Sequence, residues 1–284
     1  MAEKKPFFFG PKPDYHRFYA GVRFPQTYYF DSDLRLFGPV QQWDYSVADF
    51  DVTISAFQSH DEGFVYAALF RTLFQHAPAP PYVITFGFKF KNSNFGIAGR
   101  IIHYKQFMSK GQKNTINGTV GSDIYSNFYG EAPFLQNYEN TDGHNIYSLG
   151  AEFIYTIIRS NNQKHWLDVN GMIGPGLSYP RTDATIVTPN GTIRQRNNNF
   201  KVAGGGMVFE VGLMGTIFNH LTFTLEGNFT VIRNSNMYII SDGTSDLRGS
   251  QTISAFSWST GLAFTFPVKP YKKLREEAKA ATGK

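Results

Sequence analysis

Charged residues on one face of alternating segments are the most direct candidates for chemistry in this sequence. Three bases and six acids share that face: Arg23, Asp49, Asp51, Lys89, Arg100, Glu152, Asp168, Glu210 and Glu226. Charges that leave water must pair or be neutralised. If the segments enclose a narrow interior, this set predicts a salt-bridged plug. A narrow polar conduit that favours cations is the functional alternative. A catalytic carboxylate pair is a third, although the spacing specifies no partner geometry.

Histidines supply the other candidate chemistry. His76 and His103 fall near one predicted rim, on segments separated by a single neighbour. Serine hydrolases pair a His with a Ser, and an acid or amide orients the imidazole. Ser109 and Asp61 do not stand in that pattern beside these histidines. His103 is therefore interpreted as a residue that touches lipid headgroups, and catalysis by His103 or His76 is the weaker hypothesis. A metal site made of these histidines and loop acids is weaker still, so no metal or cofactor is expected.

The composition excludes several function classes. The 284 residues include no cysteine, which rules out a disulfide scaffold, a thiolate metal site and a cysteine nucleophile. The formal net charge is +5, but six basic and two acidic residues lie from Val268 onward, so most of that charge belongs to the tail. A basic groove for nucleic acid is therefore not predicted. No apolar run follows the basic start of the chain, so no signal peptide is expected within it.

Period-two alternation dominates the chain, as it does in strands with two unlike faces. From Leu221 to Val231, one face carries Leu, Phe and Val, and the other carries Thr, Glu and Asn. Ten such segments can be counted, of which those at residues 63–76 and 95–108 are apolar on both faces for part of their length. A helix is expected only at Lys272–Ala281, after the last of these strands.

The connecting segments indicate a barrel. The short ones are residues 59–62, 92–94, 160–163 and 218–220, and the long ones are residues 26–42, 109–145, 181–199 and 241–251. Short turns at one rim and long loops at the other are typical of outer-membrane barrels, in which the short turns face the periplasm. An even number of strands then places both ends of the barrel on the periplasmic side.

The bulky side chains distinguish a membrane barrel from a soluble one, which turns its apolar face inward. Here the polar face is mainly Gly, Ser, Thr and Asn, which fit a narrow interior, and the Phe-rich face fits lipid. The predicted fold is an all-β, transmembrane, antiparallel up-and-down β-barrel of about ten strands, within a range of eight to twelve. Aromatic residues near strand ends are expected to form interfacial girdles: Tyr15, Tyr19, Trp43, Tyr45, Tyr82, Tyr104, Tyr147, Trp166 and Tyr179.

The last strand resembles the C-terminal signal by which outer-membrane proteins are recognised for insertion, with Trp258, Leu262, Phe264 and Phe266 as its signal residues. This chain continues for 18 residues beyond Phe266, whereas the family normally ends there. Two glycine-rich segments, residues 95–105 and 170–180, resemble strands of OmpW-like and lipid-A-modifying barrels. The resemblance implies a bacterial outer-membrane location, contact with lipopolysaccharide and insertion by the outer-membrane assembly machinery.

Three segments are expected: a periplasmic stretch at residues 1–14, the barrel at residues 15–267, and a basic periplasmic tail at residues 268–284. The loop at residues 109–145 is more aromatic than an exposed loop requires, so we expect it to fold over the mouth or to contact a protein partner. Its candidate contact residues are Tyr125, Phe128, Tyr129, Phe134 and Tyr138. The predicted function is a structural or accessory subunit of an outer-membrane complex, or a narrow solute conduit. An outer-leaflet lipid-A-modifying enzyme is the alternative.

Overall fold

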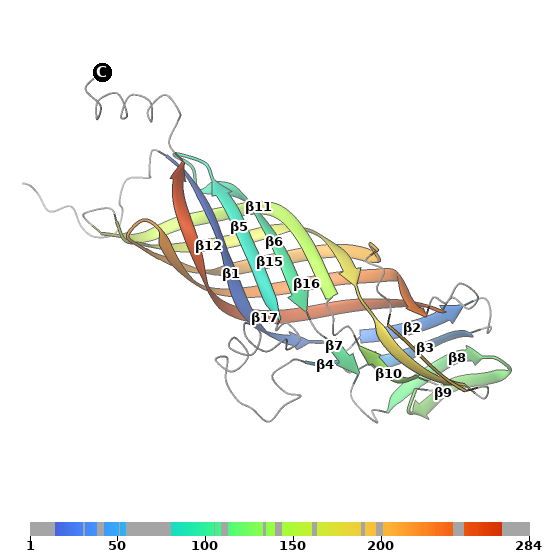
Figure 1. Cartoon of the computed structure of the whole chain (residues 1–284). Helices are drawn as coiled ribbons and strands as arrows, with labels where there is room; N and C mark the ends of the chain where they lie inside the picture. Colours follow the sequence, from blue (N-terminus) through green and yellow to red (C-terminus); the bar gives the residue numbers. More distant parts are fainter. Residues whose placement is uncertain are drawn as a thin grey trace, which may run out of the picture.

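The computed structural model is a slanted tube of long antiparallel strands with shorter strands beyond one end (Figure 1). It describes residues 15–30, 32–38, 43–50, 52–54, 81–104, 106–108, 113–132, 135–139, 144–160, 164–188, 191–196, 201–240 and 247–268. Residues 43–50, 52–54, 106–108, 137–139, 188, 196 and 240 are described by their backbone alone.

Eight long strands form a ring in which neighbours run antiparallel. In order around the ring they are β1 (His16–Tyr29), β5 (Tyr82–Lys89), β6 (Phe95–Tyr104), β11 (His144–Arg159), β12 (Trp166–Pro180), β15 (Gly204–Ile217), β16 (Leu221–Ile240) and β17 (Leu247–Val268). β17 pairs with all of β1, from His16 opposite Val268 to Tyr29 opposite Ala255, and this pairing closes the ring. A closed ring has no strand edge whose backbone groups would lie unpaired in hydrocarbon.

The strands of the ring are strongly staggered. Paired residues followed once around the ring from Arg17 lead back to β1 at Thr27, which is ten residues further along. A barrel of eight strands with such a stagger has strands tilted by roughly 35–45°, and its interior is just wide enough for side chains to fill. Inward side chains must therefore contact one another.

The two rims differ as the sequence predicts. Short turns at residues 90–94 and 218–220, and the close ends of β11 and β12, lie at the same rim as the start of β1 and the end of β17 (Figure 1). The predicted range of eight to twelve strands includes the observed eight. Two of the ten strands counted in the sequence are not part of the ring. Of these, residues 50 and 52–54 fall in shorter strands outside the ring, and residues 63–76 lie outside the described residues. The helix expected at Lys272–Ala281 also lies outside the described residues. Within the described part of the chain, no helix is long and apolar enough to cross a membrane.

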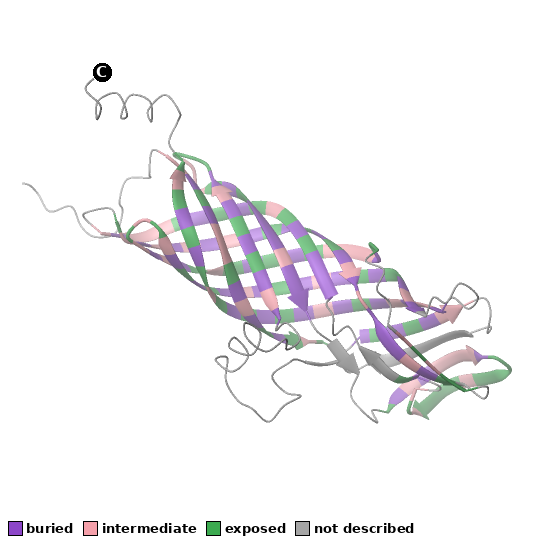
Figure 2. Ribbon diagram, in the orientation of Figure 1, coloured by how far each residue is buried: buried purple, intermediate pink, exposed green. Residues whose placement is uncertain are grey.

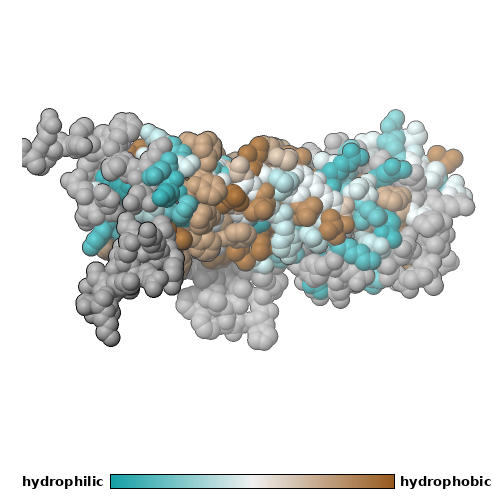
Figure 3. Space-filling view, turned by 90° about the horizontal axis from the view of Figure 1, so that it is seen from above, coloured by the Kyte–Doolittle hydropathy of each residue, from teal (hydrophilic) through white to brown (hydrophobic). Residues whose placement is uncertain are grey.

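The outer face of the ring is apolar around its middle. Buried and exposed side chains alternate along each strand (Figure 2), and the exposed positions carry large apolar groups. On β15 to β17 they include Phe209, Val211, Leu213, Phe223, Leu225, Phe229, Phe256, Trp258, Leu262 and Phe264. Figure 3 shows a hydrophobic band with hydrophilic surface on either side of it. We call it the apolar belt, and it is the surface that a barrel presents to lipid.

Beyond the long-loop rim the chain builds a second layer, which we call the outer head. β17 continues past the belt and pairs with β2 (Ser32–Gly38), and the same sheet extends through β3 (Trp43–Phe50), β8 (Asn114–Val120) and β9 (Asp123–Gly130). A second sheet has the order β14 (Gly191–Arg196), β13 (Asp183–Thr188), β10 (Leu135–Glu139), β7 (Gln106–Met108) and β4 (Val52–Ile54).

An apolar core joins the two sheets of the outer head. Its buried members are Leu34, Leu36, Ile116, Val120, Leu135, Ala184, Ile186, Ala203, Met237, Ile239 and Leu247. Except for Ala203, which directly precedes β15, they come from β2, β8, β16 and β17 in one sheet and from β10 and β13 in the other. The head is therefore a β-sandwich, with two sheets packed face to face, and its core is separate from the lumen of the barrel.

Truncation of the head core should loosen the head and leave the barrel folded. Ile186 is 1% exposed and its neighbour Val187 is 38% exposed. Ile186→Ala should cost about 2–5 kcal/mol of head stability, because it opens a cavity that the sandwich cannot fill. Limited proteolysis of the purified protein should then cut the head faster, while the barrel keeps its heat-dependent mobility in detergent gels. Val187→Ala is the matched control, and equal protease resistance of the two variants would contradict a packed head.

Candidate functional site

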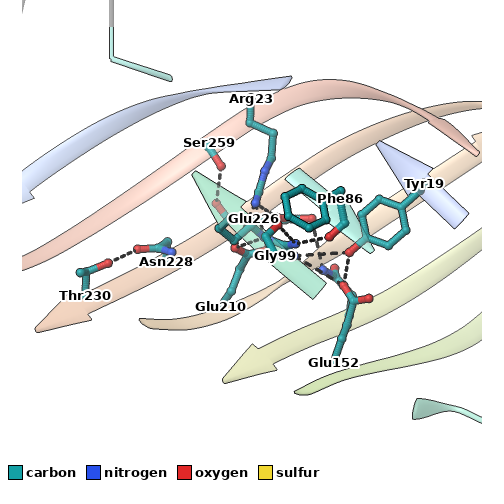
Figure 4. A network of polar contacts seen from close by, with 12 residues as sticks. Tyr19, Arg23, Phe86, Gly99, Glu152, Glu210, Glu226, Asn228, Thr230 and Ser259 are labelled. Carbon is teal, nitrogen blue, oxygen red and sulfur yellow. Dashed lines mark hydrogen bonds and ion pairs between the residues drawn. The ribbon is translucent and has the colours of Figure 1, made fainter. Parts of the chain in front are cut away.

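A network of polar side chains from several strands meets inside the barrel (Figure 4). Its members occupy inward positions on five strands: Tyr19 and Arg23 on β1, Arg100 on β6, Glu152 on β11, Glu210 on β15 and Glu226 on β16. All six are buried. We call them the ionic cluster, and the alternation of each strand places them there.

Arg100 lies at the centre of the ionic cluster. Its Nε donates to both carboxylate oxygens of Glu210, at 3.1 and 2.9 Å, and its Nη2 donates to Glu210 Oε1 at 2.8 Å. Nη2 also lies 3.5 Å from Glu152 Oε1 and 3.4 Å from the Tyr19 hydroxyl. Nη1 donates to the backbone carbonyls of Phe86 and Gly99 at 3.3 and 3.0 Å. The guanidinium thus joins β6 to four other strands of the wall.

Arg23 extends the ionic cluster to the other side of the lumen. Its Nη1 and Nη2 each lie 3.0 Å from an oxygen of Glu210, so two guanidiniums share this carboxylate. Nη1 also pairs with Glu226 Oε2, and Glu226 Oε1 accepts a hydrogen bond from Asn170 Nδ2 at 3.2 Å. Arg23 therefore bridges β1 to β15 and β16 through the interior.

Tyr19 completes the ionic cluster by donating its hydroxyl hydrogen to Glu152 Oε1. Its ring lies over Gly87 on the neighbouring strand, where a Cβ would fall about 2.3 Å from the ring carbons. Only glycine leaves room for the ring at this point. Tyr19 was expected in an interfacial girdle, and that expectation is wrong because the residue has the same parity as Arg23 on β1 and points inward. Tyr104 and Trp166, also expected in girdles, are likewise buried.

A second layer of charge lies closer to the short-turn rim. Arg17 Nη1 pairs with Asp168 Oδ2 at 2.9 Å, and Thr156 Oγ1 donates to Asp168 Oδ1 at 2.5 Å. The guanidiniums of Arg17 and Arg159 stack on the Trp166 ring, 5.2 and 5.5 Å from its centroid. Lys89 is buried and is paired with Arg17 in the register of β5 with β1. This layer, with three bases and one acid, complements the ionic cluster, with two bases and three acids.

The lumen becomes apolar toward the outer head. Val83, Ile102, Tyr104, Ile146, Val208, Ile232 and Ala255 form one buried cluster, against which Tyr29 packs. These residues come from seven of the eight ring strands. The eighth, β12, contributes Gly176, whose missing Cβ would lie 3.0 Å from Ile146 and 3.3 Å from Val208. Tyr104 joins this apolar layer to the polar part below it, because its hydroxyl donates to Asn228 Oδ1 at 3.2 Å.

The structure brings together most, but not all, of the charged residues named from the sequence. Arg23, Arg100, Glu152, Glu210 and Glu226 form the ionic cluster, and Lys89 and Asp168 lie in the adjoining layer. Asp49 lies in β3, outside the ring, where the side chain is not described, and Asp51 lies outside the described residues. Arg17 and Arg159 were missed, although Arg17 has the same parity as Arg23 on β1.

The histidines named from the sequence lie near the long-loop rim or outside the described residues. His103 is on the outward side of β6 but is only 6% exposed; its ring stacks on Tyr82 at 4.7 Å and its Nδ1 lies 2.9 Å from Asn145 Oδ1. His76 lies outside the described residues. A pair that sequence spacing did not reveal is His144 and Ser178, with Nε2 and Oγ 2.6 Å apart, but both residues are fully buried. Among the described residues no group of acids and histidines could hold a metal.

The four residues of the predicted insertion signal lie on the outside of the barrel. Trp258, Leu262, Phe264 and Phe266 occupy exposed outward positions of β17, and their recognition during insertion stays a prediction. In the outer head, Phe128 and Tyr129 are exposed on β9, and Tyr125 is half-buried and stacks edge-on with Phe128. Phe134 lies outside the described residues, and the side chain of Tyr138 on β10 is not described.

Comparison with known proteins finds likeness in structure and none in sequence. No family model and no curated protein matches the chain. The outer membrane protein OprG from Pseudomonas aeruginosa is 10% identical, with a TM-score of 0.41, and the match covers 91% of this chain and 99% of OprG. The outer membrane protease OmpT from Escherichia coli is 12% identical, with a TM-score of 0.40 and coverage of 93% and 99%. Ail of Yersinia pestis is 9% identical, with a TM-score of 0.32 and coverage of 89% and 99%.

The class of this protein follows from its own construction. The ring is closed by β1 and β17, charged groups point inward, and the outward face is an apolar belt between polar rims. The chain is an integral β-barrel of the outer-membrane type. In that class the rim with short turns and both barrel ends faces the periplasm, and the long-loop rim with the outer head faces outward.

Removal of one partner from the ionic cluster should destabilise the barrel strongly. Arg100→Met leaves Glu210 and Glu152 buried with too few donors, which should cost about 3–5 kcal/mol of unfolding free energy. The double variant Arg100→Met/Glu210→Met should cost less than Arg100→Met alone, because it removes a charge of each sign. Urea unfolding in lipid vesicles, followed by tryptophan fluorescence, measures both.

The head offers a matched control for this comparison. Arg194 and Asp183 form an ion pair of 3.3 Å in which the arginine side chain is 69% exposed. Arg194→Met should cost at most about 1 kcal/mol, because water screens such a pair. If Arg100→Met costs no more than this control, the ionic cluster does not hold the wall of the barrel together.

Proposed function

We propose that the protein is a non-conducting outer-membrane anchor, which holds a folded head outside the cell as an accessory subunit of an envelope complex. The single observation that carries this proposal is the filling of the lumen. An ionic cluster spans five strands, and an apolar layer above it receives side chains from seven strands. The barrel therefore has the features of a membrane anchor, and the head has those of the exposed part that contacts other proteins.

The filled lumen weighs against a solute conduit, which is the other function that the polar face allows. A conduit needs charged groups that face water, but the guanidiniums of Arg23 and Arg100 are taken up by carboxylates and backbone carbonyls. Above them, the apolar layer is made mainly of aliphatic side chains. Ions and polar solutes would have to break buried pairs and then cross this layer, and both steps are costly.

The outer head supports a partner-binding role. β9 is the last strand in its sheet and exposes Ile124, Phe128 and Tyr129, of which Ile124 is 81% exposed and Tyr129 is 69% exposed. Exposed aromatic and aliphatic groups on one strand are typical of surfaces that another protein covers. We place the partner contact of the head on this strand.

The remaining segments are given roles by their place in the chain. Residues 1–14 and 268–284 are assigned to the periplasm. The outward residues of β17 are assigned to recognition by the assembly machinery.

A lipid-A-modifying activity has less support in this geometry. His144 and Ser178 have the separation of a base and a nucleophile, but neither is exposed and both point into the lumen rather than toward lipid. A nucleophile must reach the reacting carbonyl, and the wall of the barrel separates this serine from the outer leaflet. His103 is 6% exposed, and its Nδ1 lies 2.9 Å from Asn145 Oδ1.

The purified barrel should not conduct ions. Planar-bilayer recordings with the intact protein are expected to show no resolved steps, because the ionic cluster and the apolar layer both close the lumen. The variant Arg23→Ala/Arg100→Ala/Glu210→Ala/Glu226→Ala, which empties the ionic cluster, should remain closed as long as the apolar layer is intact. Regular steps with the unaltered protein would overturn the anchor proposal in favour of the conduit.

The exposed apolar side chains of β9 should be required for partner capture but not for folding. Ile124→Ser/Phe128→Ser/Tyr129→Ser should abolish the recovery of cross-linked envelope proteins in native pull-downs from outer membranes, because it removes the apolar contact surface. Heat-dependent gel mobility should stay unchanged. Val187→Ser on β13 is a control that removes an exposed apolar group elsewhere on the head. Identical sets of partners for both variants would contradict a contact on β9.

A further inference from the structure

Buried bases gather around a single acid where the lumen meets the short-turn rim, which we call the periplasmic mouth. Lys89 is the last residue of β5 and Arg159 the last of β11, while Trp166 begins β12 and Arg17 is the second residue of β1. All four are at most 7% exposed, and Asp168, the acid of the group, is fully buried. The group thus lies inside the barrel, next to the side that faces the periplasm.

Asp168 is already engaged by side chains of the barrel. Its Oδ2 accepts from Arg17 Nη1 at 2.9 Å, and its Oδ1 accepts from the Thr156 hydroxyl at 2.5 Å. Because β1 and β12 are diametrically opposite in the ring of eight strands, the Arg17 side chain spans the mouth to reach this carboxylate. One carboxylate neutralises one base, so it leaves positive charge in the mouth.

One edge of the Arg17 guanidinium has no acceptor. Its Nε and Nη2 are buried and have no hydrogen-bond partner among the described residues. These two N–H groups are parallel, and they form the fork with which arginine binds two oxygens of one anion. No other buried arginine in the described part of the chain has two such donors on one edge. Since a charged donor buried without an acceptor is costly, this edge indicates a place for an oxyanion.

Lys89 adds a second cation beside Arg17. The two residues are paired in the register of β1 with β5, and residues paired in this way have Cβ atoms about 5 Å apart on the same face. Lys89 is 3% exposed, and within the described ranges no ion pair or hydrogen bond engages its ammonium. Two neighbouring cations that are shielded from water repel each other, and an anion between them removes this repulsion.

The other side chains of the mouth hold this pair in place. The Arg17 guanidinium stacks on the Trp166 ring, 5.2 Å from its centroid. On β15, β16 and β17, the hydroxyl of Thr222 lies 2.9 Å from that of Thr216 and 2.8 Å from that of Thr265. This half of the mouth is satisfied by its own hydrogen bonds, whereas the donors that lack an acceptor lie on the half formed by β1 and β5.

We propose that Arg17 and Lys89 form a binding site for one phosphate group, which enters the periplasmic mouth from the periplasm. The Nε–Nη2 edge of Arg17 binds two phosphate oxygens, and the Lys89 ammonium binds a third. A carboxylate has only two oxygens and cannot use all of these donors. The wall of the barrel separates the site from lipid headgroups, so its ligand is a water-soluble phosphate rather than a phospholipid. The site is independent of the anchor role and of the partner surface on β9.

Titration of the refolded full-length protein with inorganic phosphate, in a maltoside detergent that contains no phosphate, tests the site. The chain has three tryptophans, so Trp43→Phe/Trp258→Phe leaves Trp166 as the reporter of the periplasmic mouth. Phosphate should change the Trp166 fluorescence until the site is saturated. It should also raise the urea midpoint of unfolding, because only the folded barrel holds the site. Sodium chloride at the same ionic strength should do neither.

Substitution of each cation should weaken the binding of phosphate. Lys89→Met should weaken it by about tenfold, because one charge-assisted hydrogen bond is lost. This variant should fold and should be at least as stable as the unaltered protein in phosphate-free buffer, since it removes a buried charge that has no carboxylate of its own. Arg17→Lys keeps a cation near Asp168 but loses the fork, and it should weaken binding by a similar factor.

The matched control is Lys91→Met, which removes an exposed lysine at the same rim, two residues after Lys89, and should leave binding unchanged. If phosphate changes neither the fluorescence nor the midpoint, or if Lys89→Met and Lys91→Met lose affinity equally, the site does not exist. Acetate that binds as tightly as phosphate would overturn the assignment to a phosphate group. A response to phosphatidylglycerol in the detergent, without one to inorganic phosphate, would assign the site to a lipid headgroup and overturn entry from the periplasm.

Discussion

The pairing of β1 with β17 is the interaction on which the rest of this structure depends. Hydrocarbon offers no hydrogen-bonding partner, so a sheet can cross it only when its two edge strands find each other. The seam runs the full length of β1, and its register sets the stagger of the whole ring. With eight strands and that stagger, the circumference is small. Every inward side chain then contacts others, so the side chains in the lumen must pack closely together.

The charged and apolar side chains in the lumen form layers along the barrel axis. Nearest the short-turn rim, bases outnumber acids around Arg17 and Asp168, and above them acids outnumber bases around Arg100 and Glu210. Two guanidiniums share the Glu210 carboxylate, which satisfies several buried donors with one acceptor group. The apolar layer then ends the polar column. Burial of so many charges is costly unless all are paired. Their complementary order explains how a narrow barrel can tolerate them.

Period-two alternation predicted which face of each strand points into the barrel and which points outward. A shift of one residue would turn every outward Phe inward, so the pattern leaves one choice. It could not identify the membrane strands, since β2 alternates as well, with Leu34 and Leu36 in a sandwich core and Arg35 outside. The surplus segment at residues 50–54 was counted for the same reason, because it alternates but falls in β3 and β4 outside the ring. Tyr19 shows a second limit, because aromatic character suggested an interface whereas strand parity placed it beside Arg100. The pair of His144 and Ser178 is created by strand register, across 34 residues of sequence, and no local pattern marks it.

β16 and β17 belong to both the barrel and the outer head. They are 20 and 22 residues long, whereas a tilted strand needs only about 9–11 residues to cross a bilayer. The inward face of β16 is polar at Glu226 and Asn228, joins the apolar layer at Ile232, and enters the sandwich core at Met237 and Ile239. One continuous ladder therefore fixes the head on the barrel without a flexible linker. Because the belt sets the position of the barrel in the bilayer, the same strands also fix how far above the lipid each residue of the head stands.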